Sequence, residues 1–232
     1  MADRFKDKMT SGVVVLGGVS AGKALLIAVV TKDLVGKFHA GKIIAPFGGQ
    51  STSQPPERGP MWSLEYTDAD TPADLKKAIR RNIYYGANII KFVTGDMSYY
   101  YSRDEIQLAA DEAHRAGITL AVHVISDGPA ARNAILGGAD SIEHGLFLED
   151  ESLLLMKERG TVLVATEFPW EHNALYYGGK DQVAQSDEQQ IIDRLQRAYK
   201  MGVTLAFGSD VYYQYPGQTL PESVFDFVDI WV

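Results

Sequence analysis

The sequence predicts an α/β fold in which parallel strands alternate with helices, as in an incomplete (β/α)₈ TIM-like barrel. Three observations support this prediction. A unit of amphipathic helix, glycine and short apolar strand recurs along the chain, capping sequences mark helix starts, and the strands are apolar on both faces. A chain of 232 residues, of which 22% are charged, suits one barrel domain spanning residues 1–232.

Seven strands are expected from the apolar runs. Five of them each follow a glycine that can end a helix by adopting a positive φ: residues 89–93, 120–124, 141–144, 162–165 and 204–207. Two more are expected at residues 13–16, after an opening helix, and at residues 43–46. A barrel needs eight strands, so the sequence predicts a missing first strand that would lie just before residue 1.

Helix starts are expected where a capping side chain precedes a helical pattern. Thr71 precedes a first-turn proline, and the sequences 102–105 and 186–189 both fit a capping box. A closing helix is expected at about residues 220–230. Residues 48–70 are rich in Gly, Ser, Pro and Gln and are expected to form one irregular loop, either a substrate lid or a mobile surface segment.

The composition of the chain argues against several classes of function. The net charge of −8 argues against nucleic acid as a partner, because an acidic chain gains nothing from phosphate counterion release. The absence of cysteine excludes thiolate chemistry. The apolar run 24–30 is too short to span a bilayer, so no membrane association is expected. The first residues do not resemble a signal peptide, which favours a cytoplasmic location.

Four polar residues are expected at the carboxyl ends of the strands, where parallel barrels place their active sites: Lys91, His123, His144 and Asp210. Two neutral imidazoles and a carboxylate suit Zn²⁺ or a similar divalent metal. A lysine in an apolar strand must be paired, neutralised or chemically modified. A single strand histidine is more often a core residue than a ligand, but two with an aspartate favour a metal site.

The other histidines are assigned lesser roles. His39 and His114 are expected on helices as surface or packing residues, and His172 in a loop after residues 162–165, where it could contact substrate. Tyrosines are expected to line the barrel mouth or to pack within loops: 99–101, 176–177 and 212–213.

Several segments resemble the amidohydrolase superfamily, and most closely its imidazolonepropionase-like or prolidase-like branch. Residues 88–95 resemble the strand-four lysine motif, 111–123 the strand-five segment, 138–145 the strand-six signature and 207–210 the strand-eight ending, with a looser strand-two match at 11–18. These motifs occur in order, and the match covers most of the chain from about Leu75 to Asp210.

The resemblance implies a metal-dependent hydrolase of small-molecule or dipeptide-like substrates. Carboxylated Lys91 would bridge two divalent ions such as Zn²⁺, His123 and His144 would bind the second ion, and Asp210 would bind the first and act as general base. The implied reaction is hydrolysis of an amide, peptide-like or cyclic amide bond, with an ester or lactone as an alternative.

The sequence departs from the family pattern in ways that keep other readings open. It contains no His-x-His pair, Gln50 follows Gly-Gly where relatives often have histidine, and Val124 and Ile125 follow the strand-five histidine where relatives often have a polar residue. The usual β-sandwich is also missing from the pattern. The rival hypotheses are a non-catalytic or inactive barrel fragment, and a metal-free enzyme using Lys91 as a Schiff base. An open barrel seam would also favour association with another copy of the chain.

Overall fold

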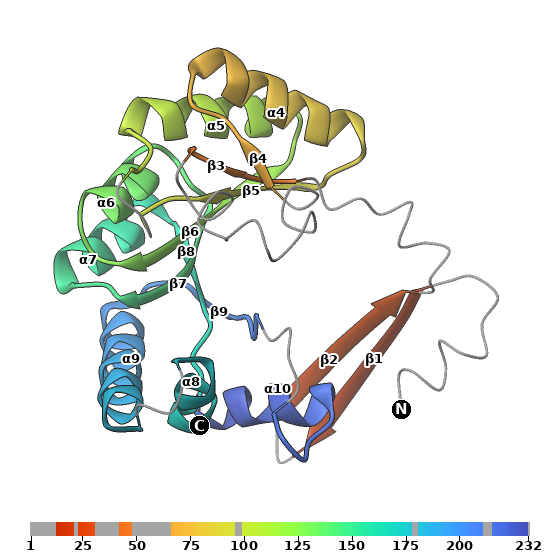
Figure 1. The fold of residues 1–232 in the computed structure, drawn as a ribbon, viewed down its shortest axis with the longest axis vertical. Helices are drawn as coiled ribbons and strands as arrows, with labels where there is room; N and C mark the ends of the chain where they lie inside the picture. Colours follow the sequence, from red (N-terminus) through yellow and green to blue (C-terminus); the bar gives the residue numbers. More distant parts are fainter. Residues whose placement is uncertain are drawn as a thin grey trace.

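The computed structural model describes residues 42–47, 66–95, 99–177, 181–210 and 215–231, together with the backbone of residues 13–20 and 23–30. Seven strands form a parallel sheet in the order β4-β3-β5-β6-β7-β8-β9 (Figure 1). They are β3 (Ile43–Ala45), β4 (Tyr66–Asp68), β5 (Ile89–Val93), β6 (Thr119–Ser126), β7 (Ser141–Phe147), β8 (Val162–Ala165) and β9 (Leu205–Phe207).

Helices alternate with the strands along most of the chain: α4 (Pro72–Tyr84), α5 (Arg103–Arg115), α6 (Pro129–Leu136), α7 (Asp150–Arg159), α8 (Trp170–Tyr177), α9 (Asp181–Met201) and α10 (Leu220–Asp229). Helices α4, α5, α6, α7 and α9 contact one another in succession and form an outer layer along the sheet (Figure 1). The expected parallel α/β fold is therefore confirmed. No helix in the described part of the chain is long and apolar enough to cross a membrane.

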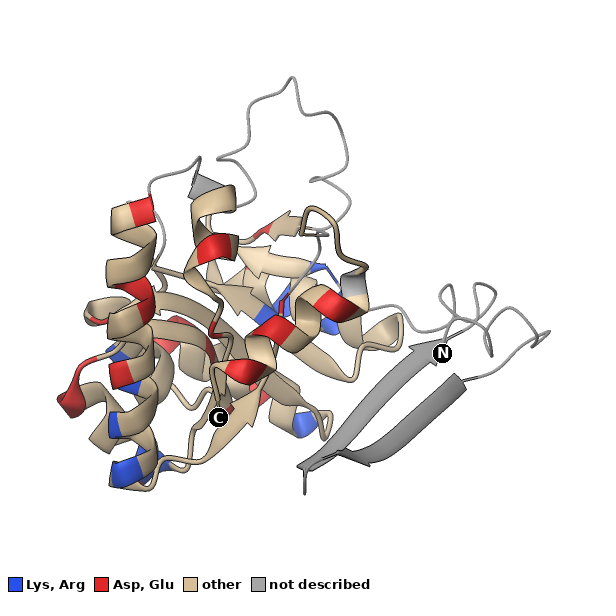
Figure 2. Cartoon of the chain, turned by 90° about the horizontal axis from the view of Figure 1, so that it is seen from below, with Lys and Arg blue, Asp and Glu red and all other residues tan. Residues whose placement is uncertain are grey.

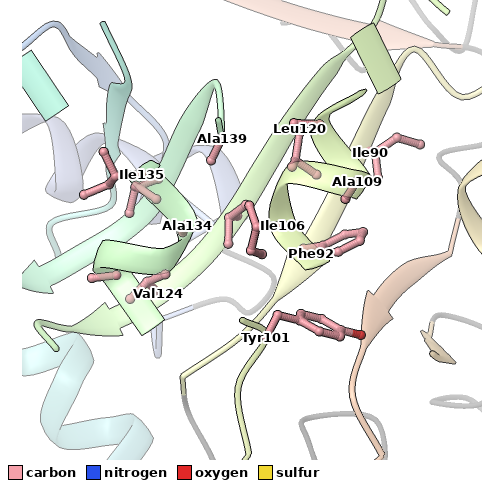
Figure 3. Close-up of a cluster of buried hydrophobic side chains, with 14 of the residues drawn as sticks. Ile90, Phe92, Tyr101, Ile106, Ala109, Leu120, Val124, Ala134, Ile135 and Ala139 are labelled. Carbon is pink, nitrogen blue, oxygen red and sulfur yellow. The ribbon is translucent and has the colours of Figure 1, made fainter. Parts of the chain in front are cut away.

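The main apolar core lies between the sheet and the helices. Figure 3 shows Ile90 and Phe92 of β5 together with Leu120 and Val124 of β6 and with Ile106 of α5. All five are at most 1% exposed, and burial of one such side chain contributes about 1.5–3 kcal/mol. Side chains alternate along a strand, so the residues between these core positions face the opposite side of the sheet.

Local signals predicted the helix ends well. Thr71 and Ser102 both form capping boxes, with Asp74 and Glu105 respectively. The expected stop glycines at positions 86, 117, 138, 160 and 202 all have positive φ. The start expected at Ser186 was wrong, because α9 begins at Asp181. The buried stripe of this helix already includes Ala184, so tertiary packing extends the helix past the local capping signal.

The expected strand at residues 13–16 belongs to a different sheet. It is part of β1 (Val13–Ser20), which pairs antiparallel with β2 (Lys23–Val30) in a separate two-stranded sheet. Only two residues separate these two β-prone runs in sequence, which favours a local hairpin over insertion into the parallel sheet. The expectation that this strand joins the main sheet was therefore wrong, and the expected opening helix lies outside the described residues.

The seventh strand of the parallel sheet is β4, within the segment 48–70 that was expected to be irregular throughout. Its three residues pair with β3, and Tyr66 packs with Ala45 and Val93 in a small buried cluster. A strand this short has too few residues to show an alternating pattern, so its position depends on these tertiary contacts. Residues 48–65 lie outside the described part of the chain.

Candidate metal centre

Lys91 and His123 lie on the face of the sheet opposite the helices. Lys91 stands between the core residues Ile90 and Phe92, and it pairs with Ala121 of the neighbouring strand. His123 follows Ala121 by two residues, so both side chains point to the same face. His123 pairs with Val93, so it lies two residues nearer the carboxyl ends of the strands than Lys91.

His144 interrupts the alternation of β7. Its register partner is Val124, which is buried in the core beside the helices. A regular strand would therefore place His144 in that core. Instead His144 has a left-handed backbone with φ 70, and its ring meets the ring of His123 at a centroid distance of 4.4 Å. The unusual backbone thus accompanies the pairing of the two imidazoles on the site face.

A hydrogen bond orients the His144 ring. Its Nδ1 atom lies 2.7 Å from the Oγ1 atom of Thr166, directly after β8, and both side chains are buried. The other ring nitrogen, Nε2, lies 3.9 Å from Oδ2 of Asp210. This division of the two nitrogens is typical of a ligating histidine, whose second nitrogen is held by a neighbouring polar group.

Asp210 lies in the loop that follows β9, beyond the strand end where it was expected. Its backbone is also left-handed, with φ 49. Among the described residues, His144 and Asp210 are the only non-glycine residues with positive φ. Such conformations cost about 1–3 kcal/mol and cluster at functional sites. Asp210 is two-thirds exposed, so its carboxylate is accessible to solvent.

The electrostatics of the cluster keep His144 neutral. Burial, followed by the nearby His123 and Lys91, lowers the pKa of His144 to about 2. Partial desolvation beside the cluster also raises the pKa of Asp210, although its side chain is two-thirds exposed, while the charges of Lys91 and His123 oppose that increase. Lys91 and His123 therefore act on both residues, which places all four side chains in one electrostatic neighbourhood. A neutral imidazole is the form that binds a metal.

The donor chemistry of this cluster fits a divalent ion. Two imidazoles and a carboxylate are the donors that zinc prefers. The described residues contain no group of three or more His, Cys, Asp or Glu side chains already arranged around one point. Of these donors, the Nε2 atom of His144 and the exposed carboxylate of Asp210 lie 3.9 Å apart.

Comparison with known proteins supplies the family. The model of the amidohydrolase family matches residues 40–221, which is most of the chain. The chain belongs to the amidohydrolase family.

Two solved structures resemble this family member closely enough to support its fold. A Xaa-Pro dipeptidase with bound methionine in its active site is 27% identical, with a TM-score of 0.66, over 87% of this chain and 56% of that one. A prolidase complexed with N-methylphosphonate-L-proline is 27% identical, with a TM-score of 0.63, over 75% of this chain and 48% of that one.

Ochratoxinase from Aspergillus niger is 28% identical over 218 residues, or 87% of this chain and 44% of the ochratoxinase. This amidohydrolase chain therefore spans about half the length of these relatives. The comparisons confirm the expected resemblance and the barrel class.

The other histidines considered in the sequence analysis are not part of the cluster of four residues. His114 lies on α5 and bonds Asp140 at 2.7 Å, as expected for a packing residue of this amidohydrolase. His172 is not in a loop: it lies in α8, 2% exposed, with Nε2 3.1 Å from Oδ2 of Asp226 in α10. That contact links α8 to α10, and the prediction of a loop at His172 did not include such a contact. His39 lies outside the described residues.

The expected tyrosine lining is only partly present. Tyr101 is fully buried, and its hydroxyl donates to the carbonyl of Ala69 at 2.9 Å, so it is a core residue and not part of the mouth. Tyr99 and Tyr100 are exposed. The tyrosine side chains at 176–177 and 212–213 lie outside the described part of the chain.

Sequence reasoning did not assign a role to Thr166 or to the buried pair of Glu167 and Arg194. Thr166 and Glu167 directly follow the apolar run of β8, which was a usable signal for a strand-end site. Arg194 carried no such signal, because it lies one helix further along, within α9.

Proposed function

We propose that this chain provides part of the metal centre of a metal-dependent hydrolase that cleaves a C–N bond in an amide, peptide-like or cyclic amide substrate. One observation carries the proposal. The Nε2 atom of a neutral His144 in β7 and the carboxylate of Asp210 in the loop after β9 lie 3.9 Å apart, and both residues have left-handed backbones. Membership of the amidohydrolase family, which is typically metal-dependent, supports the same assignment.

Lys91, His123, His144 and Asp210 are the proposed metal-binding residues, for one or two divalent ions such as Zn²⁺, with Lys91 carboxylated. A bound metal supplies Lewis acidity, lowering the pKa of water and polarising a carbonyl. The chain's own contributions are positional. Thr166 holds Nδ1 of His144 so that Nε2 is available, and His123 packs against the same ring. Asp210 is the proposed general base, because its accessible carboxylate can accept a proton and return it to the leaving nitrogen.

A dipeptide-like or other amino-acid-containing compound is the proposed substrate. The prolidase and the Xaa-Pro dipeptidase that resemble this chain bind a proline analogue and methionine respectively. The exposed rings of Tyr99 and Tyr100 follow β5 at the carboxyl end of the sheet, where they could contact an apolar part of such a ligand. An ester or lactone would undergo the same chemistry and is the alternative substrate class.

Elemental analysis of the purified chain tests the proposal directly. We expect one or two Zn-like ions per chain, reduced in Lys91→Ala and in His144→Ala because each variant removes a proposed ligand. His114→Ala is the matched control, since this histidine is on the outer helix α5 and bonds Asp140. Its metal content should equal that of the wild type.

Hydrolysis of a panel of dipeptides by the metal-loaded chain is the second measurement. Metal in the wild type together with turnover would support the hydrolase. Metal without turnover would favour a non-catalytic barrel. A metal-free wild type would contradict the proposed centre.

A further inference from the structure

Arg194 is a charged residue that is completely buried. It lies in α9, and it is the largest fully buried side chain among the described residues. Its Nη2 atom donates to Oε1 of Glu167 at 2.6 Å, and both side chains are completely inaccessible to solvent. Arginine is almost never fully buried unless it is paired, so the position of this pair needs an explanation.

The guanidinium joins the ends of two strands. Besides Glu167, its Nε atom donates to the carbonyl oxygen of Leu146 at 3.4 Å. Leu146 follows His144 by two residues, and Glu167 directly follows Thr166. Arg194 therefore connects the two segments whose side chains form the bond between His144 and Thr166.

The backbone ladder does not extend to this point. The register between β7 and β8 runs from Ser141 and Val162 to Glu143 and Val164, and it ends one residue before His144. Beyond it, the two strand ends are held by the bond between His144 and Thr166 and by the contacts of Arg194. The left-handed backbone of His144 lies in this segment, and such a conformation persists only when its surroundings hold it.

A contribution to the stability of the fold does not by itself explain why Arg194 and Glu167 form a buried ion pair. Desolvation of two charges offsets much of their attraction, and well-packed apolar residues often stabilise a fold equally well. Burial raises the pKa of Glu167, and the charge of Arg194 opposes this increase. The ionised form of Glu167 therefore depends on the charge of Arg194. A buried charged pair is better suited to imposing one geometry on the groups that it connects.

We propose that Arg194, together with Glu167, is a positioning residue for the metal centre. It holds the ends of β7 and β8 so that the His144 ring stays between Thr166 and His123 with Nε2 toward Asp210. The role in metal binding rests on the proposed function, whereas the role in placing the ring does not and can be tested without metal.

The contacts of Arg194 with Glu167 and with the Leu146 carbonyl are called the clamp here. Two variants remove these contacts in different ways. The double variant Arg194→Met with Glu167→Leu deletes both charges, so no unpaired charge is left in the core. Arg194→Lys keeps the charge but loses the forked donor that reaches two partners. Arg197→Met is the matched control, because Arg197 lies one turn along α9 and bonds the Leu148 carbonyl at 3.2 Å, but it pairs with exposed carboxylates.

The first readout is the position of the ring in the metal-free chain. The protein has five histidines, so histidine-selective labelling gives a simple NMR spectrum. We expect a nuclear Overhauser cross-peak between the rings of His123 and His144, whose centroids are 4.4 Å apart, in the wild type and in Arg197→Met. The cross-peak should weaken or disappear in the double variant and in Arg194→Lys. A purely stabilising role would not move this signal in a folded variant.

The second readout is Co²⁺ affinity, followed by visible absorption. We expect the two clamp variants to bind roughly 10- to 100-fold more weakly than the wild type, as for loss of other groups that orient ligands. An unchanged cross-peak and unchanged affinity in folded variants would overturn the proposal. So would failure of both clamp variants to fold, because the pair would then be a requirement of the fold. If the wild type binds no Co²⁺ but the cross-peak depends on Arg194, the positioning role stands and the proposed metal function fails.

Discussion

The Nε2 atom of His144 lies 3.9 Å from Oδ2 of Asp210, and the two residues share a left-handed backbone found at no other non-glycine position in the described part of the chain. One residue interrupts strand β7 and the other follows β9. A local turn preference does not explain both, because they belong to different kinds of segment. What His144 and Asp210 share is that each brings a side-chain donor atom to the same side of the sheet.

The backbone of Asp210 gives a first prediction. Asparagine tolerates the left-handed region, whereas a β-branched residue does not. In the metal-free chain, Asp210→Asn should therefore change the free energy of unfolding by less than about 0.5 kcal/mol. Asp210→Val should lower it by about 1–2 kcal/mol. Urea unfolding measures both, and equal stability of the two variants would show that Asp210 is not left-handed in solution.

Thr166 should affect metal binding through His144. Thr166→Val keeps the shape but removes the hydroxyl, which leaves the buried Nδ1 atom without this partner. We expect a loss of about 1–3 kcal/mol in stability and a metal affinity weaker by roughly 10- to 100-fold. Thr166→Ser retains the hydroxyl, so its metal affinity should stay near the wild-type value in the same titration. Similar affinities for the valine and serine variants would argue against this orienting bond.

Gly95 follows the strand that carries Lys91 and combines two constraints. Its φ is 90, and a Cβ atom there would lie 2.8 Å from Cβ of Ala130. Gly86 has the same φ but nothing within 4 Å, so Gly86→Ala isolates the conformational cost. We expect Gly86→Ala to lower the free energy of unfolding by about 1–2 kcal/mol and Gly95→Ala by about 1–3 kcal/mol more. Chemical denaturation would decide, and equal losses would contradict the close contact with α6.

The pH dependence of stability should depend on Glu112. Hydrogen bonds from Arg80, at 2.8 and 3.0 Å, are the main reason that the pKa of this buried carboxyl is lowered from 4.5. Below pH 4.5 the unfolded chain takes up the proton first, so this contribution is present above that pH and is lost as the pH falls through the folded pKa.

Glu112→Gln removes the titrating group. Its thermal midpoint should therefore fall less steeply than that of the wild type as the pH decreases below about 4.5. Parallel curves for the two proteins would mean that Glu112 contributes little to acid unfolding.

Local signals predicted much of the fold because they act over a few residues. The capping box of Ser102 with Glu105 and the helix-ending glycines need only their sequence neighbours. The start of α9, the pairing of β1 with β2 and the strand β4 were missed. Each of these depends on which segment packs or pairs with which, and neither short strands nor long helices encode that locally.

By itself, the sequence determined the alternation of helices with most strands of the parallel sheet and the four residues whose chemistry suits a metal: Lys91, His123, His144 and Asp210. Periodicity and side-chain type are properties of the chain, so they can be read without coordinates. Only the tertiary structure decided which atoms meet. The turn of the His144 ring toward His123, its bond to Thr166 and the clamp of Arg194 on Glu167 depend on strand register and helix docking between distant segments. Those relations are set by packing of the whole sheet against its helices, and no local pattern contains them.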